Sequence, residues 1–364
     1  MAILAYEMAR SQIYMVLLDM VDLPKINSID VENKRVIVRG DLDVSDFSEK
    51  DIRLQRLAPT LKYLIDKKAK VILIGHLGRP EGKIANEFSL KPVVDVLEKM
   101  LGLKINFIYD IAGVEAHDAS NELKSGEIMC IENLRFDSRE ESNDPVFAKS
   151  LSELGDLFVN EAFSVSHRAH ASIVGIPKYL PSYAGLNLTN EVENLSKVFT
   201  PERPLLFLIS GAKKDKIDYI NPLSEIADKI LVGGRLPEFL GDNTESVRTQ
   251  NGKIIVGNLV MDKEDITLNT IDKFKEEINK AKTIVLAGAL GKYEDAGHSQ
   301  GTQEIFDAVG DASAVFKIIG GGDSLTAATQ YGIIDKFNWV SVGGGAMLDF
   351  LIQKTLVGLE ALHI

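Results

Sequence analysis

The apolar run Leu157-Phe158-Val159-Asn160 is followed closely by Ser-His-Arg-Ala-His-Ala-Ser at residues 166–172, which carries two histidines and an arginine. A short continuous apolar run of this kind predicts a buried strand. Three other runs in the first half also end in cations: Arg39 follows Lys34–Val38, His76 and Arg79 follow Val71–Gly75, and Arg135 follows Ile128–Ile131. The carboxyl ends of parallel strands meet in one crevice of an open α/β sheet. We therefore expect a cationic pocket suited to a small, multiply anionic ligand.

Short apolar runs alternate with amphipathic stretches along almost the whole chain. Stretches such as Asp51–Lys67, Leu90–Leu101 and Leu268–Lys280 have apolar residues at three- and four-residue spacing, which predicts helices. Apolar strands separated by helices indicate a parallel sheet covered on both faces. Ten such strands are too many for one compact domain, so we expect an α/β protein with two doubly wound, Rossmann-like parallel sheets. The expected strands are Arg35–Val38, Val71–Ile74, Ile128–Ile131, Leu157–Asn160, Leu205–Ile209, Lys229–Val232, Ile254–Val256, Thr283–Leu286, Phe316–Ile319 and Trp339–Val342.

Prolines and polar residues suggest where the two sheets separate. Pro177 and Pro181 mark a boundary within Pro177–Tyr183, and the polar stretch Asn190–Thr200 is interpreted as a helix that joins the two lobes. We expect an N-terminal extension over 1–20, one domain over 21–183, a second over 184–350, and a tail over 351–364.

The composition narrows the class of protein. The chain has 364 residues, 45% of them hydrophobic, and a net charge of −12, which is typical of a globular protein and argues against nucleic acid or an anionic membrane as the main partner. The single cysteine, Cys130, excludes an internal disulfide and fits a reducing cytoplasm. Residues 1–20 contain Glu7, Arg10 and Asp19, so neither a membrane span nor a signal peptide is expected.

Glycines replace the cations at the strand ends of the second half. They occur in Gly211-Ala212-Lys213, Gly233-Gly234-Arg235, Gly288–Gly291, Gly320-Gly321-Gly322-Asp323-Ser324 and Gly343-Gly344-Gly345. Glycines between strand and helix let a phosphate or a base approach the backbone, and the helix N-terminus supplies N–H donors. Five such turns predict a nucleotide site, although neither Gly-x-Gly-x-x-Gly nor a complete P-loop is present. Asp323 could hold Mg²⁺ on the nucleotide phosphates or serve as the N-cap of a helix over Ser324–Gln330.

Taken together, these segments resemble phosphoglycerate kinase from about Leu23 to the C-terminus. The matching pieces are Val-Arg-Gly-Asp-Leu-Asp-Val (38–44), Asp-Ile-Arg (51–53), Gly-His-Leu-Gly-Arg-Pro (75–80), Glu-Asn-Leu-Arg-Phe (132–136), Asn-Glu-Ala-Phe-Ser-Val-Ser-His-Arg-Ala-His-Ala-Ser (160–172), Gly-Ala-Lys (211–213) and Gly-Gly-Gly-Asp-Ser (320–324). The resemblance implies reversible, Mg²⁺-dependent phosphoryl transfer between 1,3-bisphosphoglycerate and ADP, which gives 3-phosphoglycerate and ATP. It also implies a monomeric cytoplasmic enzyme whose two lobes close by hinge motion, with a tail that returns to the first lobe.

The resemblance also implies which residues form the site. The expected phosphoglycerate site comprises Arg39, Asp41, Asp43, Arg53, His76, Leu77, Gly78, Arg79, Arg135 and Arg168. The expected nucleotide site comprises Gly211, Lys213, Lys216, Gly233, Gly234, Glu294, Gly321, Gly322, Asp323 and Ser324, with Asp323 on the metal. Arg53 and Lys213 are the expected catalytic side chains, and Gly322 and Gly345 the backbone donors that face the migrating group.

Four departures from the family pattern leave alternatives open. Asp43 replaces an asparagine, Ala287 replaces the asparagine of Trp-Asn-Gly-Pro, the turn 211–216 is one residue short, and the region Glu238–Ile266 is shortened. These departures would fit a family member that binds nucleotide or phosphoglycerate as a regulatory protein without efficient turnover. Alternatively, Asp43 would mark a kinase for another carboxylate.

Overall fold

The computed structural model describes residues 22–44, 46–240 and 252–364. In these residues the chain forms two six-stranded sheets, and every strand pairing is parallel. The α/β class with two parallel sheets is thereby confirmed. The chain divides into two compact units. The first comprises the residues up to Glu193 together with Thr355–Ile364, and the second comprises Asn194–Lys354. The expected extension over residues 1–20 lies outside the described residues.

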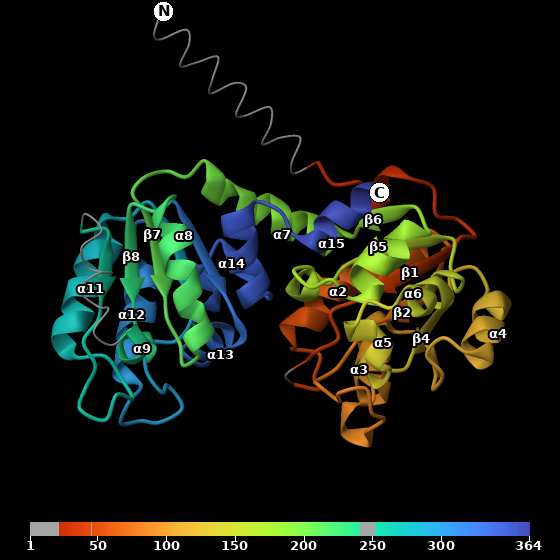
Figure 1. Cartoon of the computed structure of the whole chain (residues 1–364), viewed down its shortest axis with the longest axis horizontal. Coiled ribbons are helices and arrows are strands. Elements are labelled where there is room, and N and C mark those ends of the chain that lie inside the picture. The colour runs from red at the N-terminus through yellow and green to blue at the C-terminus, as the bar shows by residue number, and fades with distance from the viewer. Residues whose placement is uncertain (1–21, 45, 241–251) are drawn as a thin grey trace, which may run out of the picture. The chain divides into compact units, whose positions relative to one another are not determined.

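The sheet of the first unit has the strand order β3-β4-β2-β1-β5-β6 (Figure 1). Its strands are β1 (Arg35–Arg39), β2 (Lys70–Ile74), β3 (Ile105–Ile108), β4 (Ile128–Ile131), β5 (Leu157–Asn160) and β6 (Ser182–Ala184). The central strands β1, β2 and β4 are buried over almost their whole length, since helices cover both faces. Their carboxyl ends therefore point to one edge of the sheet, where Arg39 and His76 lie.

The sequence patterns missed two strands, and both are edge strands. The residues of β3, Ile-Asn-Phe-Ile, include the exposed Asn106, so that strand does not read as a continuous apolar run. The three residues of β6 follow Pro181 directly, within the stretch interpreted as a domain boundary. An edge strand pairs on one side only, so it needs neither the length nor the apolar composition that makes a central strand visible.

The helices of the first unit are α2 (Ile52–Asp66), α3 (Lys91–Leu101), α4 (Val114–Glu122), α5 (Ser138–Glu141), α6 (Pro145–Ser152) and α7 (Leu186–Ser196). The apolar sides of α2 and α3 pack on one face of the sheet, against alternate strand residues such as Val36, Val71 and Cys130. The thiol of Cys130 is fully buried, and burial raises its pKa. Cys130 is thus part of the hydrophobic core.

The sheet of the second unit has the strand order β12-β11-β10-β7-β8-β9. Its strands are β7 (Leu205–Ile209), β8 (Lys229–Val232), β9 (Ile254–Val256), β10 (Thr283–Ala287), β11 (Phe316–Gly320) and β12 (Trp339–Ser341). Its helices are α8 (Ile220–Ser224), α9 (Leu236–Leu240), α11 (Leu268–Lys280), α12 (Gln300–Asp311), α13 (Gly322–Gln330) and α14 (Gly344–Gln353). Helix α11 packs on α12 and α12 on α13, whereas α8 contacts α14 (Figure 1).

The helix at the end of the first unit, α7, begins at Leu186, four residues before the predicted start at Asn190, and a 3₁₀ turn over Lys197–Phe199 follows it. The sequence pattern missed this start because the acceptors for the first N–H groups of the helix belong to residues that are distant in sequence. The carboxylate of Glu161 accepts from Asn187 N at 3.0 Å and from Leu188 N at 2.9 Å, and Thr60 Oγ1 accepts from Leu186 N at 3.1 Å.

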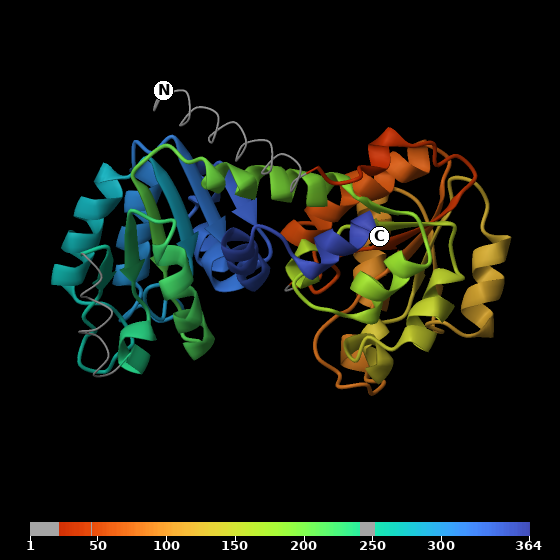
Figure 2. The same cartoon turned by 45° about the horizontal axis from the view of Figure 1, so that its top comes forward.

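The tail packs on the first unit. The turn Ala361–His363 contacts β6, and helix α15 (Val357–Glu360) contacts the turn Ala171–Gly175; in both views the C-terminus lies against the first unit (Figures 1 and 2). Gly358 N donates to Ser166 O at 2.8 Å, and Asn160 Nδ2 donates to Gly358 O at 3.4 Å. The described residues include no helix that is both long and apolar enough to span a bilayer.

Candidate active site

Four arginines and a histidine gather at the carboxyl edge of the first sheet: Arg39, Arg53, Arg135, Arg168 and His76. Arg39 is the last residue of β1, His76 lies two residues after β2, and Arg135 lies in the turn Leu134–Phe136 that follows β4. Burial lowers the pKa of His76, as do the charges of Arg39, Arg135 and Arg53; burial also lowers the pKa of Arg135, and the charge of Arg168 adds to this effect. These side chains are therefore close enough to interact electrostatically on a chain that is acidic as a whole.

Arg39 is fully buried, and its guanidinium N–H groups form hydrogen bonds with other residues of the protein. Its Nε donates to Ser172 Oγ at 2.9 Å, its Nη1 to Gly40 O at 2.6 Å, and its Nη2 bonds His76 Nδ1 at 3.1 Å. Burial lowers the pKa of Arg39. Because three of its nitrogens already bond neighbouring residues, we interpret Arg39 as a residue that positions its neighbours rather than one that contacts a ligand.

Asp43 forms a hydrogen bond with the loop that follows β2. Its Oδ1 accepts from Gly78 N at 2.8 Å, and its Oδ2 lies 3.8 Å from His76 Nε2. Gly78 has φ +65, and a Cβ there would come within 2.3 Å of the Phe88 ring, so the turn needs a glycine. Leu77 is buried, and its carbonyl accepts from Asn133 Nδ2 at 2.7 Å. Asp43 thus helps to hold the loop that carries His76.

Arg53 lies in the first turn of α2 and pairs with Asp41. Asp51 is the N-cap of this helix and accepts a hydrogen bond from Arg53 N, so the cap positions the backbone that carries the Arg53 side chain. Arg53 Nη1 donates to Asp41 Oδ1 at 2.6 Å, and this carboxylate raises the pKa of Arg53. The second oxygen of Asp41, Oδ2, is buried and accepts no hydrogen bond from the described residues. An orphaned buried acceptor beside an arginine marks a position where a ligand donor would fit.

The three remaining arginines of the expected site differ in their hydrogen bonds and in their exposure to solvent. Arg135 Nη1 donates to Gly78 O at 2.7 Å, and its Nε lies 3.2 Å from Glu141 Oε1 without hydrogen-bond geometry. Arg168 Nε donates to His167 Nε2 at 3.2 Å and is half-buried. Arg79 is exposed.

Sequence patterns missed two residues that shape this cluster, Glu140 and Ser172. Ser172 lies in a π-helical turn, Ala171–Gly175, and its N–H donates to Glu140 Oε2 at 2.9 Å while its Oγ accepts from Arg39. Burial raises the pKa of Glu140 despite the nearby Arg39. The only signal in the sequence was position: Glu140 follows the Glu-Asn-Leu-Arg-Phe motif, and Ser172 closes the histidine motif.

A cavity of about 300 Å³ opens at the carboxyl edge of the second sheet. Four residues expected in the nucleotide site line it: Gly211, Gly234, Glu294 and Asp323. The other lining residues are Ala212, Arg235, Glu264, Ala289, Leu290, Gly291, Lys292 and Tyr293. Of these, Ala212, Arg235 and the residues 289–291 belong to the glycine turns that predicted the site, whereas Glu264, Lys292 and Tyr293 had not been singled out. Lys213, Lys216, Gly233, Gly321, Gly322 and Ser324 belong to the neighbouring turns and are not among the lining residues.

Lys216 turns toward the sheet and contacts two strand ends. Its Nζ donates to Ser210 O at 2.6 Å and to Ala287 O at 3.3 Å. Burial lowers its pKa to about 8, although the charge of Asp323 acts in the opposite direction. A Cβ at Gly288 would come within 2.8 Å of this ammonium group, so the glycine makes room for it. Lys216 therefore brings a cation to the ends of β7 and β10.

The glycine turn before α13 leaves its backbone accessible. The N-cap is Gly321, with φ +98, and Ser324 Oγ accepts from Gly288 N at 2.7 Å. Asp323 lies in the first turn, so the interpretation of Asp323 as the N-cap of this helix is wrong. A Cβ on Gly322 or Gly345 would meet no atom within 4 Å, which leaves space for a ligand beside the starts of α13 and α14.

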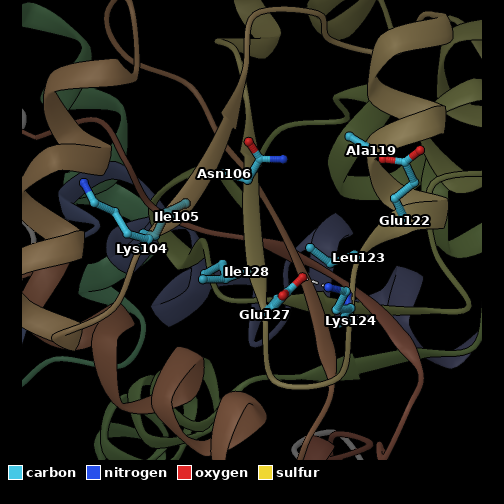
Figure 3. A pocket seen from close by; sticks show the side chains of 9 residues that line it. All are labelled: Lys104, Ile105, Asn106, Ala119, Glu122, Leu123, Lys124, Glu127 and Ile128. Carbon is cyan, nitrogen blue, oxygen red and sulfur yellow. Dashed lines mark hydrogen bonds between the residues drawn. The ribbon is translucent and has the colours of Figure 1, made fainter.

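A second, open cavity in the first unit lies away from these residues. It has a volume of about 930 Å³, and Lys104, Asn106, Glu122 and Glu127 line it (Figure 3). These residues belong to the amino ends of β3 and β4 and to α4. Ligands of open parallel sheets bind at the carboxyl ends of the strands, so the candidate site is at the opposite edge.

Comparison with known proteins gives one consistent answer. The family model of phosphoglycerate kinase matches residues 26–243 and 238–354. The phosphoglycerate kinase of Coprothermobacter proteolyticus is 37% identical over 94% of this chain and 99% of its own length, and that of Finegoldia magna is 38% identical over 93% and 98%.

Solved structures agree with these matches. The structure of phosphoglycerate kinase from Coxiella burnetii superposes with a TM-score of 0.78 at 31% identity, covering 94% of this chain and 99% of that one. The structure of the Pyrococcus horikoshii enzyme has a TM-score of 0.81 at 28% identity, covering 94% and 98%. The resemblance inferred from the motifs is thereby confirmed: the chain belongs to the phosphoglycerate kinase family and is a phosphotransferase.

Proposed function

We propose that this chain transfers a phosphoryl group reversibly between 1,3-bisphosphoglycerate and ADP, giving 3-phosphoglycerate and ATP. The observation that carries the proposal is the pairing of Arg53 with Asp41 within the cationic cluster of Arg39, His76, Arg135 and Arg168. Guanidinium groups suit bidentate binding of phosphate and carboxylate. A ligand that carries both groups matches such a cluster.

We assign different roles to the members of the cluster. Arg53, Arg79, Arg135 and Arg168 bind the phosphate and carboxylate groups of the phosphoglycerate, whereas the buried Arg39 orients His76. Asp41 Oδ2, which lacks a donor among the described residues, accepts a hydroxyl hydrogen of the substrate. The carboxylate of Asp43 contributes no donor, because an ionised carboxylate only accepts hydrogen bonds.

The cavity of the second unit takes the nucleotide in this proposal. Its glycines let the base and the phosphates approach the backbone, and Lys213 and Lys216 supply positive charge. The residue that would hold Mg²⁺ is Asp323, a carboxylate that lines the cavity. The described residues contain no group of three or more potential metal ligands, which fits an ion held by one carboxylate and the phosphates of the nucleotide. When bound, Mg²⁺ neutralises charge on those phosphates.

Phosphoryl transfer then needs positioning, charge stabilisation and exclusion of water. Arg53 stabilises the charge on the transferring group, and the backbone N–H groups at Gly322 and Gly345 act as fixed donors. No covalent intermediate on the protein is needed. Because each unit holds one ligand, we propose that the hinge between them closes for the reaction.

One assay tests the proposal against the two alternatives raised by the sequence. ATP consumption with 3-phosphoglycerate is measured in a coupled assay, beside ATP binding by calorimetry. We expect turnover with 3-phosphoglycerate. Binding without turnover would instead indicate a regulatory protein, and turnover only with another carboxylate a changed substrate. No feature of the described residues favours either alternative.

A further inference from the structure

One histidine in the second unit is held between two carboxylates. His298 Nδ1 lies 3.0 Å from Asp295 Oδ2, and His298 Nε2 lies 2.9 Å from Asp262 Oδ2. The other oxygen of each aspartate is already used: Asp295 Oδ1 accepts from Gly297 N at 3.0 Å, and Asp262 Oδ1 accepts from Glu264 N at 3.1 Å. Each carboxylate is therefore oriented toward the imidazole by the backbone N–H group of the residue two positions further along the chain.

This arrangement specifies the protonation state of the ring. Ionised carboxylates only accept hydrogen bonds, and a neutral imidazole has a single N–H to donate. Both contacts can be hydrogen bonds only when His298 is an imidazolium. The hydrogen bonds with Asp262 and Asp295 accordingly raise its pKa above the usual value.

The residues bridged by His298 belong to two segments that form one wall of the nucleotide cavity. Glu264, from the segment 261–266, and Lys292, from the segment 291–299, both line the cavity. Lys292 N donates to Glu264 O at 2.9 Å, and Gly301 N donates to Asp265 Oδ2 at 2.9 Å. The contact of His298 Nε2 with Asp262 Oδ2 is a further link between these two parts of the chain, and it is made by side chains.

We propose that His298 is a positioning residue for nucleotide binding: as an imidazolium it fastens segment 261–266 to segment 291–299 and so fixes the cavity wall at Glu264 and Lys292. The proposal rests on the proposed function, in which this cavity takes the nucleotide. Loss of the ring proton leaves a single N–H for the two carboxylates, so the contact with Asp262, which joins the two segments, is weakened by competition from Asp295. Nucleotide binding is therefore tightest below the pKa of His298 and weakens as the pH rises through it.

Other charged groups near the ring do not replace the two aspartates. Asp265 interacts electrostatically with His298, and Lys292 interacts electrostatically with Asp295. The cluster is not a metal centre either, because the described residues include no set of three or more histidine, cysteine and acidic side chains arranged to hold an ion.

The test is calorimetric titration of MgADP into the full chain at pH 6 and pH 9, for the wild type, His298→Phe and the control His117→Phe. Phenylalanine keeps a ring at position 298 but makes neither bridge. His117 lies in α4 of the first unit and is not among the residues that line the cavity. Lys216 and the phosphates also titrate in this range, so the informative quantity is the ratio of the Kd of each variant to that of the wild type at the same pH.

For His298→Phe we expect a ratio of about 3 or more at pH 6, as for the loss of exposed ion pairs, and a smaller ratio that stays above 1 at pH 9, because the neutral ring of the wild type keeps one of its two contacts. The control should give a ratio near 1 at both. A ratio for His298→Phe that is near 1 at pH 6, or equally large at both values, overturns the positioning role while leaving the kinase function intact. Absence of MgADP binding by the wild type overturns both. Should His298→Phe fail to fold, His298→Asn is measured in its place, with the same expected ratios.

Discussion

Arg39 Nη2 lies 3.1 Å from His76 Nδ1, and this contact determines which ring nitrogen of the histidine carries the proton. A guanidinium can only donate, so Nδ1 must accept, and the neutral ring carries its hydrogen on Nε2. Burial and the neighbouring arginines keep the pKa of His76 well below its usual value, so the ring stays neutral at physiological pH. Its Nε2–H therefore faces Asp43, the acid that departs from the family pattern.

Replacement of Asp43 by asparagine should improve the phosphoglycerate site. Asparagine keeps the Oδ1 that accepts from Gly78 N, gains a donor, and removes a negative charge beside an anionic ligand. We expect kcat/KM for 3-phosphoglycerate to rise by up to ~10-fold, the scale of about 1–2 kcal/mol for one charge-assisted hydrogen bond. Steady-state kinetics check this, with the exposed Asp46→Asn as the control. An unchanged kcat/KM would show that the carboxylate does not oppose substrate binding.

Arg53→Ala should abolish most of the activity. The side chain is proposed to stabilise the transferring group, and loss of such an arginine lowers kcat by roughly 10²-fold or more. Asp41 would also lose its partner, so the melting temperature must be measured beside kcat and KM. Lys62→Ala, an exposed substitution on the same helix, serves as the control. A raised KM with kcat intact would remove Arg53 from the transition state.

The buried Glu161 should make stability depend on pH. Burial raises its pKa to about 7, so between the unfolded value near 4.5 and pH 7 the folded state holds a proton that the unfolded state has released. Stability is therefore greatest below the unfolded pKa and declines as the pH rises through the folded one, by up to about 3 kcal/mol.

Glu161→Gln isolates this contribution in urea unfolding at pH 5 and pH 7.5. At pH 5 the protonated acid of the wild type can still accept hydrogen bonds at both oxygens, whereas the NH2 group of the amide cannot accept, so we expect the variant to be less stable than the wild type at pH 5. We also expect this deficit to shrink at pH 7.5, because only the wild type loses stability over this range. The exposed Glu153→Gln is the matched control. A constant deficit at the two pH values would contradict the titration of Glu161.

Lys216 should link nucleotide use to pH in the alkaline range. Its pKa is lowered to about 8, so the ammonium group is lost as the pH rises through this value. We expect kcat/KM for ATP to decline above pH 8 in the wild type and to hold in Lys216→Arg, which remains protonated. Lys216→Met should lower kcat/KM by about 10-fold or more, as for loss of a charged hydrogen bond. The exposed Lys214→Met is the control, and an equal loss there would argue against a specific role.

Much of the architecture could be predicted because parallel strands buried on both faces need continuous apolar runs. Ten of the twelve strands among the described residues had such runs, whereas β3 and β6, the two outermost strands of the first sheet, did not. The start of α7 was placed too late for a related reason. Its first N–H groups are satisfied by Glu161 and Thr60, which are distant in sequence, and a pattern read locally has no access to such partners.

Residue type and order were enough to predict the class of fold, the family and the character of the strand ends, which are cationic in one unit and rich in glycine in the other. Those properties follow from residue type and order, which periodicity and motifs record directly. Tertiary structure alone decided that Arg39 is a buried support for His76, that Ser172 and Glu140 hold it there, and that His298 bridges two loops. Each of these roles depends on contacts between groups far apart along the chain, and contact in space is set by packing.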